Sequence, residues 1–303
     1  MDTPFRSGFV ALIGRPNVGK STLLNALLGQ KVAAVSPRPQ TTRRRQLGIL
    51  TLEKAQLVFM DTPGIHKPQH QLGEYMNEVA IQTLPDADVV IWLVDASVSP
   101  HAEDKLIAKQ IQEHPIPGWL IMVLNKCDLI SPDEVRHRSE QYEALCQGVE
   151  TMPISALDEK KCQALLKKVI EHLPEGPAYY DADQVTDLYE RDIAADLIRE
   201  AALFHLRDEI PHSIGVKIDE YTERSDQLAY ISATLHLERE NHKGIVIGKG
   251  GEMLKKIGST ARKEIESMSG RKVYLELKVK VNKNWRDNPE ALTQLGYILP
   301  KDD

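Results

Sequence analysis

The sequence of 303 residues predicts two domains: an α/β domain with a mostly parallel sheet flanked by helices, followed by a smaller α+β domain. Three observations lead to this prediction. The length exceeds that of one ordinary domain and suits two. The first half alternates short apolar runs with helical patterns, as expected for parallel strands joined by crossover helices. A Pro-Glu-Gly-Pro break at residues 174–177 then precedes a region with a different order of elements.

The elements expected in the first domain follow from apolar runs and helical spacing. Strands are expected at Phe9–Ile13, Leu57–Met60, Val89–Val94, Leu120–Leu124 and Thr151–Ile154. A helix is expected at Ser21–Leu28, because its leucines fall on one face and Gly29 can end it. A closing helix is expected at Cys162–Leu173. These elements assign residues 1–175 to the first domain and residues 176–186 to a linker.

The second domain, residues 187–303 with a C-terminal tail, has a different pattern. Its expected order is helix, strand, strand, helix, strand, with room for a further helix after the loop at residues 248–251. The segments are Asp187–Arg207, Val216–Tyr221, Leu228–Leu237, Glu252–Met268 and Val273–Val281. The last strand alternates apolar and charged residues, as a strand with one solvated face does.

Composition and apolar runs exclude several classes of protein. The chain is 27% charged and 42% hydrophobic, which is typical of a soluble globular protein. Val89–Val94 is the most apolar stretch and is too short to span a bilayer, so an integral membrane protein is excluded while peripheral attachment stays open. Met1–Ser7 lacks the apolar core of a secretory signal. Three cysteines without paired spacing favour a reducing cytoplasm.

The segment from Gly14 to Ser21 reads Gly-Arg-Pro-Asn-Val-Gly-Lys-Ser and matches the phosphate-binding P-loop. It lies between an expected strand and an expected helix, which is the context the motif requires. Glycines let successive backbone N–H groups face the phosphates beside the positive end of the helix dipole. Lys20 is expected to reach the β- and γ-phosphates, and the Ser21 hydroxyl to bind Mg²⁺. The sequence therefore predicts a nucleotide site here.

Four further segments in chain order indicate a guanine nucleotide. Asp61-Thr-Pro-Gly64 follows an apolar strand and offers a carboxylate for Mg²⁺ and an N–H for the γ-phosphate. Asp128 in Asn125-Lys-Cys-Asp128 can accept both N1–H and N2–H₂ of guanine, and Ser155-Ala156 suits contact with the guanine O6. A threonine of the Thr41-Thr42 pair can complete the Mg²⁺ shell when a γ-phosphate is present.

Gly248-Lys-Gly-Gly251 follows the apolar run Ile245–Ile247 and opens a helix. This is the Gly-X-X-Gly loop expected of a KH domain, which clamps about four single-stranded nucleotides, and the order of elements suits the type II form. Residues 239–286 carry 13 basic and five acidic side chains, whereas residues 181–238 carry five and 14. The basic excess fits either a solvated face or a phosphate-backbone partner.

The five nucleotide motifs resemble those of the translation-factor-like GTPases over roughly the first 175 residues. The resemblance implies GTP/GDP and Mg²⁺ as cofactors, Thr42 as the switch threonine, Thr41–Leu50 as the first switch and Thr62–Tyr75 as the second. The implied nucleotide-binding residues are Gly14, Asn17, Val18, Gly19, Lys20, Ser21, Thr22, Asp61, Gly64, Asn125, Lys126, Asp128, Ser155, Ala156 and Leu157. Ser21, Thr42 and Asp61 are the implied Mg²⁺ ligands.

The position after Gly64 departs from the pattern of Ras-like proteins, where a glutamine orients the attacking water. Here Ile65 can neither donate nor accept a hydrogen bond, which indicates slow intrinsic hydrolysis. In some members of the subgroup with a hydrophobic residue there, a P-loop asparagine helps to hold K⁺. Asn17 matches that asparagine, so it is either a K⁺ ligand or a residue that stabilises the P-loop turn. The expected catalytic residues are Lys20, Thr42, Gly64 and Asn17.

Over essentially the whole chain, a G domain followed by a type II KH domain resembles the Era family. The resemblance implies binding near the 3′ end of 16S rRNA, a role in assembly of the 30S subunit, and peripheral attachment to the inner membrane from a cytoplasmic location. The expected RNA-binding residues are Ile247, Gly248, Lys249, Gly250, Gly251 and Lys255. Two alternatives stay open: an RNA chaperone or checkpoint factor with GTP mainly as a ligand, and a membrane-linked cell-cycle GTPase.

Overall fold

The computed structural model describes residues 4–35 and 41–298 of the chain. It divides into two compact units, each with its own hydrophobic core. The first unit comprises Met1–Ala33, Thr42–Pro68 and Met76–Asp187, and the second comprises Ala34–Thr41, Gln69–Tyr75 and Leu188–Asp303. No helix of the described ranges is both long enough and apolar enough to cross a membrane.

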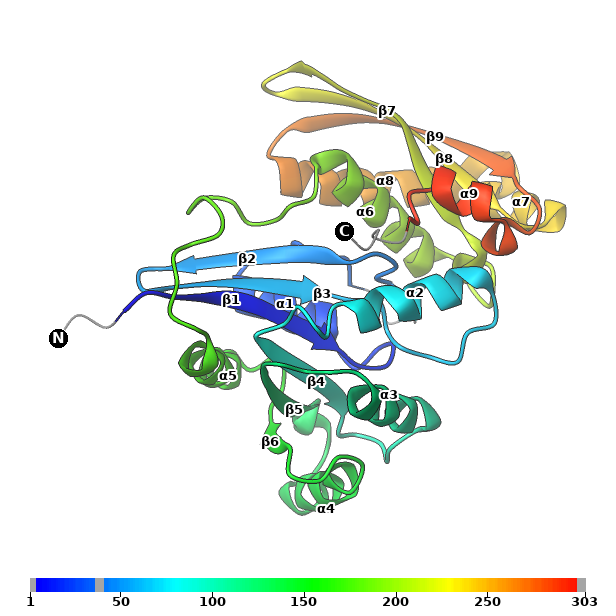
Figure 1. Ribbon diagram of the computed structural model, residues 1–303. Helices are drawn as coiled ribbons and strands as arrows, with labels where there is room; N and C mark the ends of the chain where they lie inside the picture. The colour runs from blue at the N-terminus through cyan, green and yellow to red at the C-terminus, as the bar shows by residue number, and fades with distance from the viewer. Residues whose placement is uncertain (1–3, 36–40, 299–303) are drawn as a thin grey trace. The chain divides into compact units, whose positions relative to one another are not determined.

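The first unit contains a six-stranded sheet in the order β2-β3-β1-β4-β5-β6 (Figure 1). Its strands are β1 (Arg6–Ile13), β2 (Gln46–Leu52), β3 (Ala55–Asp61), β4 (Val89–Asp95), β5 (Trp119–Asn125) and β6 (Glu150–Pro153). The edge strand β2 pairs antiparallel with β3, and the other neighbouring pairs are parallel. This confirms the expected mostly parallel sheet.

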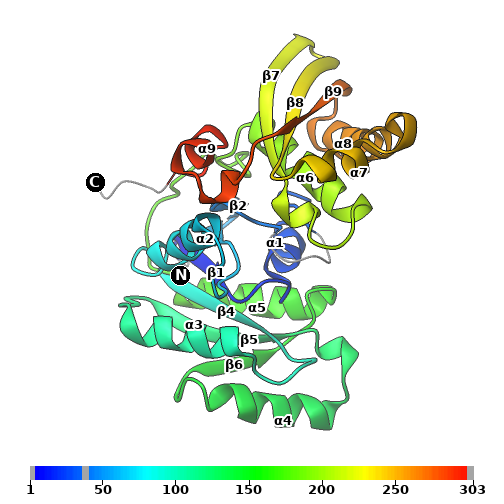
Figure 2. The ribbon, with the colours of Figure 1, turned by 90° about the vertical axis from the view of Figure 1, so that its right-hand side faces the viewer.

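Helices cover both faces of this sheet (Figure 2). They are α1 (Lys20–Leu28), α2 (Gln71–Gln82), α3 (Ala102–Glu113), α4 (Pro132–Glu143) and α5 (Glu159–His172). Leu23 of α1 and Leu165 of α5 pack in one core, whereas Ile107 of α3 and Tyr142 of α4 pack in the other. Because both faces are covered, every residue of β4 is buried, and its sequence is a nearly continuous apolar run.

The segment expected to be a linker lies along the edge of this sheet. The side-chain oxygen of Gln56 accepts hydrogen bonds from the N–H groups of Tyr179 and Tyr180, at 2.6 and 3.0 Å. The N–H of Ile49 in β2 donates to the carbonyl oxygen of Val185 at 2.9 Å. The Ile49 bond satisfies a backbone N–H that the edge strand β2 otherwise leaves exposed to pairing.

The second unit contains a three-stranded sheet in the order β7-β8-β9, with β7 antiparallel and β9 parallel to β8. Its elements are α6 (Glu190–His205), β7 (Gly215–Ser225), β8 (Leu228–Leu237), α7 (Glu240–Ile247), α8 (Glu252–Ser269), β9 (Lys272–Val281) and α9 (Pro289–Gln294). Short 3₁₀ turns lie at Cys127–Leu129, Pro211–Ser213, Lys249–Gly251 and Trp285–Asp287. Residues of α6 and α8, among them Ile198 and Ile257, pack in one core with the sheet.

One element of the second unit differs from the sequence prediction. The apolar run Ile245–Ile247 forms the last turn of α7, a helix that precedes the glycine loop, whereas the prediction left room for an additional helix after the loop. Val246 of α7 is buried in the core, while Ile245 is exposed. The observed order from α6 to β9 is helix, strand, strand, helix, helix, strand.

Candidate nucleotide-binding site and nucleic-acid groove

The P-loop connects β1 to α1 and has a backbone that glycine makes possible. Gly14 and Gly19 have φ angles of +153° and +102°, and Asn17, a residue type that tolerates the left-handed region, has +65°. A Cβ on Gly14 would lie 2.4 Å from the carbonyl oxygen of Leu93, and one on Gly19 would lie 2.4 Å from Nδ2 of Asn125. The loop is therefore packed against two neighbouring strand ends and leaves its concave side for a ligand.

Lys20 is buried within this loop. Its Nζ donates hydrogen bonds to the carbonyl oxygens of Gly14 and Arg15, at 3.0 and 3.1 Å. Burial lowers the pKa of Lys20 to about 8, while the nearby Asp61 carboxylate opposes this shift and Arg15 adds to it. A cation in such surroundings is stabilised by an anion that replaces water, which fits the role of a phosphate partner.

The three residues expected to bind Mg²⁺ lie together. Ser21 Oγ donates to Asp61 Oδ2 at 2.8 Å and lies 3.0 Å from Thr42 Oγ1, which donates to the same carboxylate oxygen at 3.2 Å. Burial raises the pKa of Asp61, and across the described residues no hydrogen-bond donor reaches its buried Oδ1. One carboxylate and two hydroxyls beside a phosphate site are a donor set that suits Mg²⁺.

The segment after Asp61 lies against the P-loop. A Cβ on Gly64 would lie 2.5 Å from the backbone nitrogen of Pro16, so the two loops are in close contact. Ile65 donates its N–H to the carbonyl oxygen of Gly14 at 3.1 Å, and its side chain, 1% exposed, packs in the core beside α2 and α3. The side chain at this position, which has no polar group, is therefore held in the core. Asn17 lies on the exposed side of the loop.

Asn125 at the end of β5 ties three loops together. Its Nδ2 donates to the carbonyl oxygen of Val18 at 2.8 Å, and its Oδ1 accepts from the N–H of Ala156 at 2.8 Å. The P-loop and both predicted base-binding loops therefore share one side chain. Thr22 lies in the first turn of α1, directly after the P-loop.

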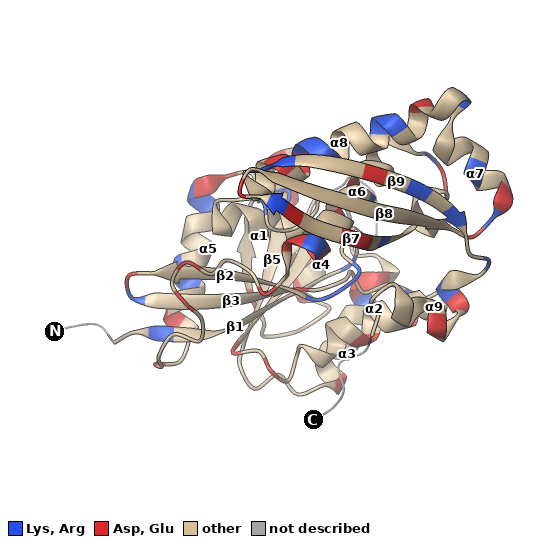
Figure 3. Ribbon diagram, turned by 90° about the horizontal axis from the view of Figure 1, so that it is seen from above, with Lys and Arg blue, Asp and Glu red and all other residues tan. Residues whose placement is uncertain are grey.

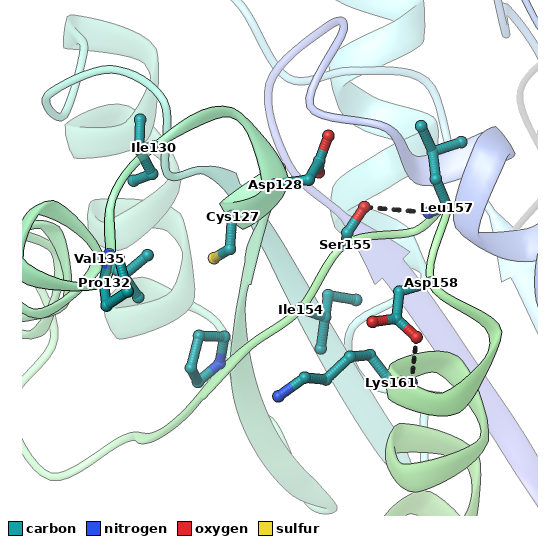
Figure 4. Close-up of a pocket in the computed structure, with 11 residues that line it drawn as sticks. Cys127, Asp128, Ile130, Pro132, Val135, Ile154, Ser155, Leu157, Asp158 and Lys161 are labelled. Atoms are coloured by element: carbon teal, nitrogen blue, oxygen red, sulfur yellow. Dashed lines mark hydrogen bonds between the residues drawn. The ribbon is translucent and has the colours of Figure 1, made fainter.

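A cavity of about 500 Å³ lies beside the predicted base-binding loops (Figure 4). Asp128 and Ser155 line it, and Ser155 Oγ accepts from the N–H of Leu157 at 3.2 Å. Cys127, which lies between them and α4, points the other way in Figure 4. The side chain of Asp128 is exposed, whereas Cys127 is partly buried.

An ionic network that no sequence motif indicates lies behind the two loops. Asp95 at the end of β4 accepts a hydrogen bond from Lys126 Nζ at 2.7 Å, and its Oδ2 lies 3.7 Å from a guanidinium nitrogen of Arg15. Burial by itself raises the pKa of the Asp95 carboxyl, but hydrogen bonds from Lys126 and Ser97 outweigh it and lower the pKa overall. Asp95 therefore stays ionised and connects the P-loop to the predicted base-binding motif.

The second candidate site is the groove of the second unit. Its glycine loop links α7 to α8, with φ angles of +74° at Gly248, +61° at Gly250 and +84° at Gly251. Lys249 is exposed beside the N-terminus of α8, and Ile247 ends α7. A Cβ on Gly248 would lie 2.8 Å from the backbone nitrogen of Met253, so the loop lies tightly on the helix it precedes.

The groove continues from this loop between α8 and β9 and has a volume of about 400 Å³. Of the predicted RNA-binding residues, Gly251 and Lys255 line it. Residues that the prediction did not name also line it: Gly258, Ser259, Arg262, Leu275 and Leu277. Their signal in the sequence was the four-residue spacing that puts Gly258 and Arg262, and Lys255 and Ser259, on one side of a helix, but the packing of α8 beside β9 was needed to identify the wall.

Two protein families match separate parts of the chain. Residues 9–126 match the family described as 50S ribosome-binding GTPase, and residues 209–286 match the KH domain. A curated relative, GTPase Era from Ruminiclostridium cellulolyticum, is 47% identical over 297 residues, which cover 98% of this chain and 99% of the relative.

Two solved structures are similar along almost the whole chain. One is a crystal structure of Era in complex with MgGDPNP and nucleotides 1506–1542 of 16S ribosomal RNA, with a TM-score of 0.91, 42% identity, and coverage of 97% of this chain and 100% of that chain. The other is a crystal structure of a single-residue variant of Aquifex aeolicus Era bound to GDP and AlF₄⁻, with a TM-score of 0.91, 41% identity and the same coverage.

Proposed function

This chain belongs to the Era family of GTPases, and on that premise we propose that it is a GTP-hydrolysing switch that binds single-stranded RNA near the 3′ end of 16S rRNA and acts in assembly and maturation of the 30S ribosomal subunit. The observation that carries the proposal is that one chain contains both a P-loop site with a guanine-type carboxylate and a Gly-X-X-Gly groove. The similar Era structure was solved with a nucleotide analogue and 16S RNA bound.

In the nucleotide site, each residue has a role that its surroundings support. Lys20 neutralises the β- and γ-phosphates, because its buried ammonium gains most from an anionic neighbour. Gly64 presents its N–H to the γ-phosphate, and Asp128 accepts the two N–H groups on the edge of guanine. Ser21, Thr42 and Asp61 hold Mg²⁺, which supplies positive charge to the β- and γ-phosphate oxygens when bound.

The residues that position the attacking water differ from those of Ras-like proteins. Ile65 is held in the core and cannot orient water, so the chain depends on charge supplied at the P-loop. Asn17 holds K⁺ there, on the exposed side of the loop. The test is single-turnover GTP hydrolysis in K⁺ and in Na⁺ at equal ionic strength. Faster hydrolysis in K⁺ that is lost in Asn17→Ala supports this role, and equal rates in the two salts refute it.

In the RNA site, Gly248–Gly251 and the first turn of α8 bind the phosphate backbone, while the groove between α8 and β9 receives the bases. Lys249, Lys255 and Arg262 supply positive charge along this path. The basic excess of residues 239–286 favours the same partner. The chain works in the cytoplasm, and this basic segment also supports peripheral association with the anionic inner membrane, which flotation with vesicles would test.

Crosslinking the protein to RNA in cells and mapping the adducts is the direct test of the proposed function. Adducts concentrated at the 3′ end of 16S rRNA, and accumulation of immature 30S subunits on depletion of the protein, support it. Adducts spread evenly over cellular RNA would refute the 30S role.

Ile65 also favours a second candidate function, in which the protein is an RNA checkpoint factor and GTP acts mainly as a ligand. Cells that carry Thr42→Ala, which removes a proposed Mg²⁺ ligand, separate the two functions, with Thr41→Ala as the matched control. Purified Thr42→Ala must first be shown to bind GTP. Normal 30S maturation with that variant would favour the checkpoint, whereas arrested maturation supports the hydrolytic switch.

A further inference from the structure

The strand β9 forms one wall of the RNA groove and also the edge of its sheet. Figure 3 shows β9 between β8 and α8, with β7 on the far side of β8. Within the described ranges, no further strand pairs with β9 on the side away from β8. Leu275 and Leu277 line the groove, so the side chains that alternate with them, Tyr274 and Glu276, lie on the opposite face of the sheet.

A ladder of planar groups crosses this opposite face and ends at β9. Tyr230 of β8 is the register partner of Tyr274, and their rings are stacked with centroids 5.8 Å apart and planes 21° apart. The guanidinium carbon of Arg224 lies 4.7 Å from the centroid of Tyr230. Tyr230 is also fixed at its hydroxyl, which donates to Glu276 Oε2 at 2.7 Å. The ladder therefore runs from Arg224 through Tyr230 to Tyr274.

Tyr274, the last ring of the ladder, is exposed to solvent. Tyr274 is 64% exposed, although it immediately precedes a residue of the groove wall. Within the part of the chain that the structure describes, Tyr230 is the one aromatic ring stacked on it. An exposed ring held rigidly beside a nucleic-acid groove is the arrangement that single-strand-binding proteins use to stack bases.

The charges around Tyr274 are compatible with RNA. Lys272, Lys278 and Lys280 alternate with apolar residues along β9 and are exposed. The acidic neighbour, Glu276, is engaged by the Tyr230 hydroxyl and lies 3.3 Å from Lys278 Nζ. Its charge is thus partly compensated by a lysine on the same strand.

We propose that an RNA strand seated in the groove continues over the edge of β9 and stacks one flanking base on Tyr274. The proposed occupant is a nucleotide of the same single strand, because Tyr274 adjoins the groove wall and the groove itself accommodates only about four nucleotides. This inference rests on the proposed RNA function. It adds a subsite outside the glycine-loop groove, on the outer face of the sheet.

Tyr274→Ala and Tyr274→Phe in the full-length protein test the subsite, with Tyr189→Ala as the matched control, since Tyr189 is 77% exposed at the start of α6. Each protein is titrated with single-stranded RNA from the 16S 3′ end, either as a four-nucleotide core or extended by four nucleotides at each end in turn. For one extended RNA, Tyr274→Ala should bind about tenfold more weakly than the wild type. The four-nucleotide RNA should bind equally to both, and Tyr274→Phe should retain the affinity.

The outcomes distinguish this subsite from the proposed function and from a structural role. If the wild type binds the extended RNA and Tyr274→Ala binds it equally well, the subsite is refuted while the RNA function stands. Equal losses with the short and extended RNA, together with a lower melting temperature, would assign Tyr274 to the stability of the sheet and also refute the subsite. If the wild type binds neither RNA, the proposed function itself fails. Weaker binding with Tyr189→Ala of the same size would show that the effect is not specific.

Discussion

Both functional regions contain a glycine loop before a helix, but the lysine of one loop is buried and that of the other is exposed. Each has a glycine loop that precedes a helix, so that N–H groups at the positive end of the helix dipole can face phosphates. In the P-loop, Lys20 is buried, and added Cβ atoms would meet neighbouring strand ends. In the groove loop, Lys249 is exposed, and although Gly248 is packed against Met253, a Cβ on Gly250 or Gly251 would meet nothing within 4 Å.

The burial of the lysine in one loop and its exposure in the other determine which ligand each loop can bind. Among the described residues, a buried lysine that contacts only carbonyl oxygens and a buried carboxylate with one unbonded oxygen favour one compact polyanion with its metal, because burial penalises charges that lack a charged partner. An exposed lysine beside an open groove favours a long, hydrated polyanion, and its contribution falls as salt screens it. The first loop is therefore suited to a nucleotide and the second to an RNA backbone.

The largest effect is expected from Asp128→Asn, which tests the base selectivity of the nucleotide site. Asparagine cannot accept both N–H groups of guanine, so GTP affinity should fall about 10³-fold, as expected when a hydrogen-bonding site loses its match. Xanthosine nucleotides, which offer a carbonyl oxygen at that edge, should bind the variant better than GTP does. Competition with a fluorescent nucleotide measures both. Unchanged preference for GTP would remove Asp128 from base recognition.

The next largest effect is expected from replacing Lys249 and Gly250 by aspartate, which tests the open loop. Two negative charges beside the N-terminus of α8 should lower RNA affinity about 100-fold, since they replace a cation and repel the backbone. GTP hydrolysis without RNA should stay within about twofold, because the P-loop site contains none of these residues.

The chain offers a matched control for this pair. Lys243 and Gly244 form the same dipeptide six residues earlier, on α7, and a Cβ on Gly244 would meet nothing within 4 Å. Aspartates there add the same charge away from the loop and should weaken RNA binding much less. Equal losses with the two double variants would mean that net charge, rather than the glycine loop, controls binding.

A smaller effect is expected from Asp95→Asn, which weakens the network behind the nucleotide site. The variant keeps the volume but loses the charge that holds Lys126 and attracts Arg15. The KM for GTP should rise about tenfold, as for loss of a charged hydrogen bond, with kcat within about twofold, since the shorter contact of Asp95 is with Lys126 of the predicted base-binding motif. Steady-state hydrolysis measures both constants.

Asp88→Asn is the control for that experiment, because Asp88 precedes the other end of β4 and accepts a hydrogen bond from the N–H of Phe9 at 2.7 Å. It should reduce stability without changing the KM. A lower kcat with an unchanged KM in Asp95→Asn would contradict the positioning role. In a Lys126→Met background, Asp95→Asn should have little further effect on the KM if it acts through Lys126.

The sequence predicted the parts of the sites that are encoded locally. The P-loop, Asp61 at the end of β3 and Asp128 after β5 have fixed spacing from apolar runs, and parallel strands bring their ends to one edge. Asp95 also follows an apolar run, but it has no motif around it, and its partners Arg15 and Lys126 are distant in sequence.

In the second unit, too, contacts between residues distant in sequence decide features that the local sequence does not predict. Residues 240–247 contain Gly244 and the β-branched Ile245–Ile247, so their local preference opposes a helix. They form α7 because Val246 packs into the core, which is a tertiary contact. The groove wall at Leu275 and Leu277 likewise depends on the placement of β9 beside α8.

Calorimetric titration with GTP and ATP in the presence of Mg²⁺ tests most directly whether the buried loop and Asp128 form a guanine-nucleotide site. We expect GTP to bind with a stoichiometry of one and ATP to bind at least about 100-fold more weakly, because adenine leaves the carboxylate without its two donors. Equal affinity for the two nucleotides, or binding of neither, would contradict the account.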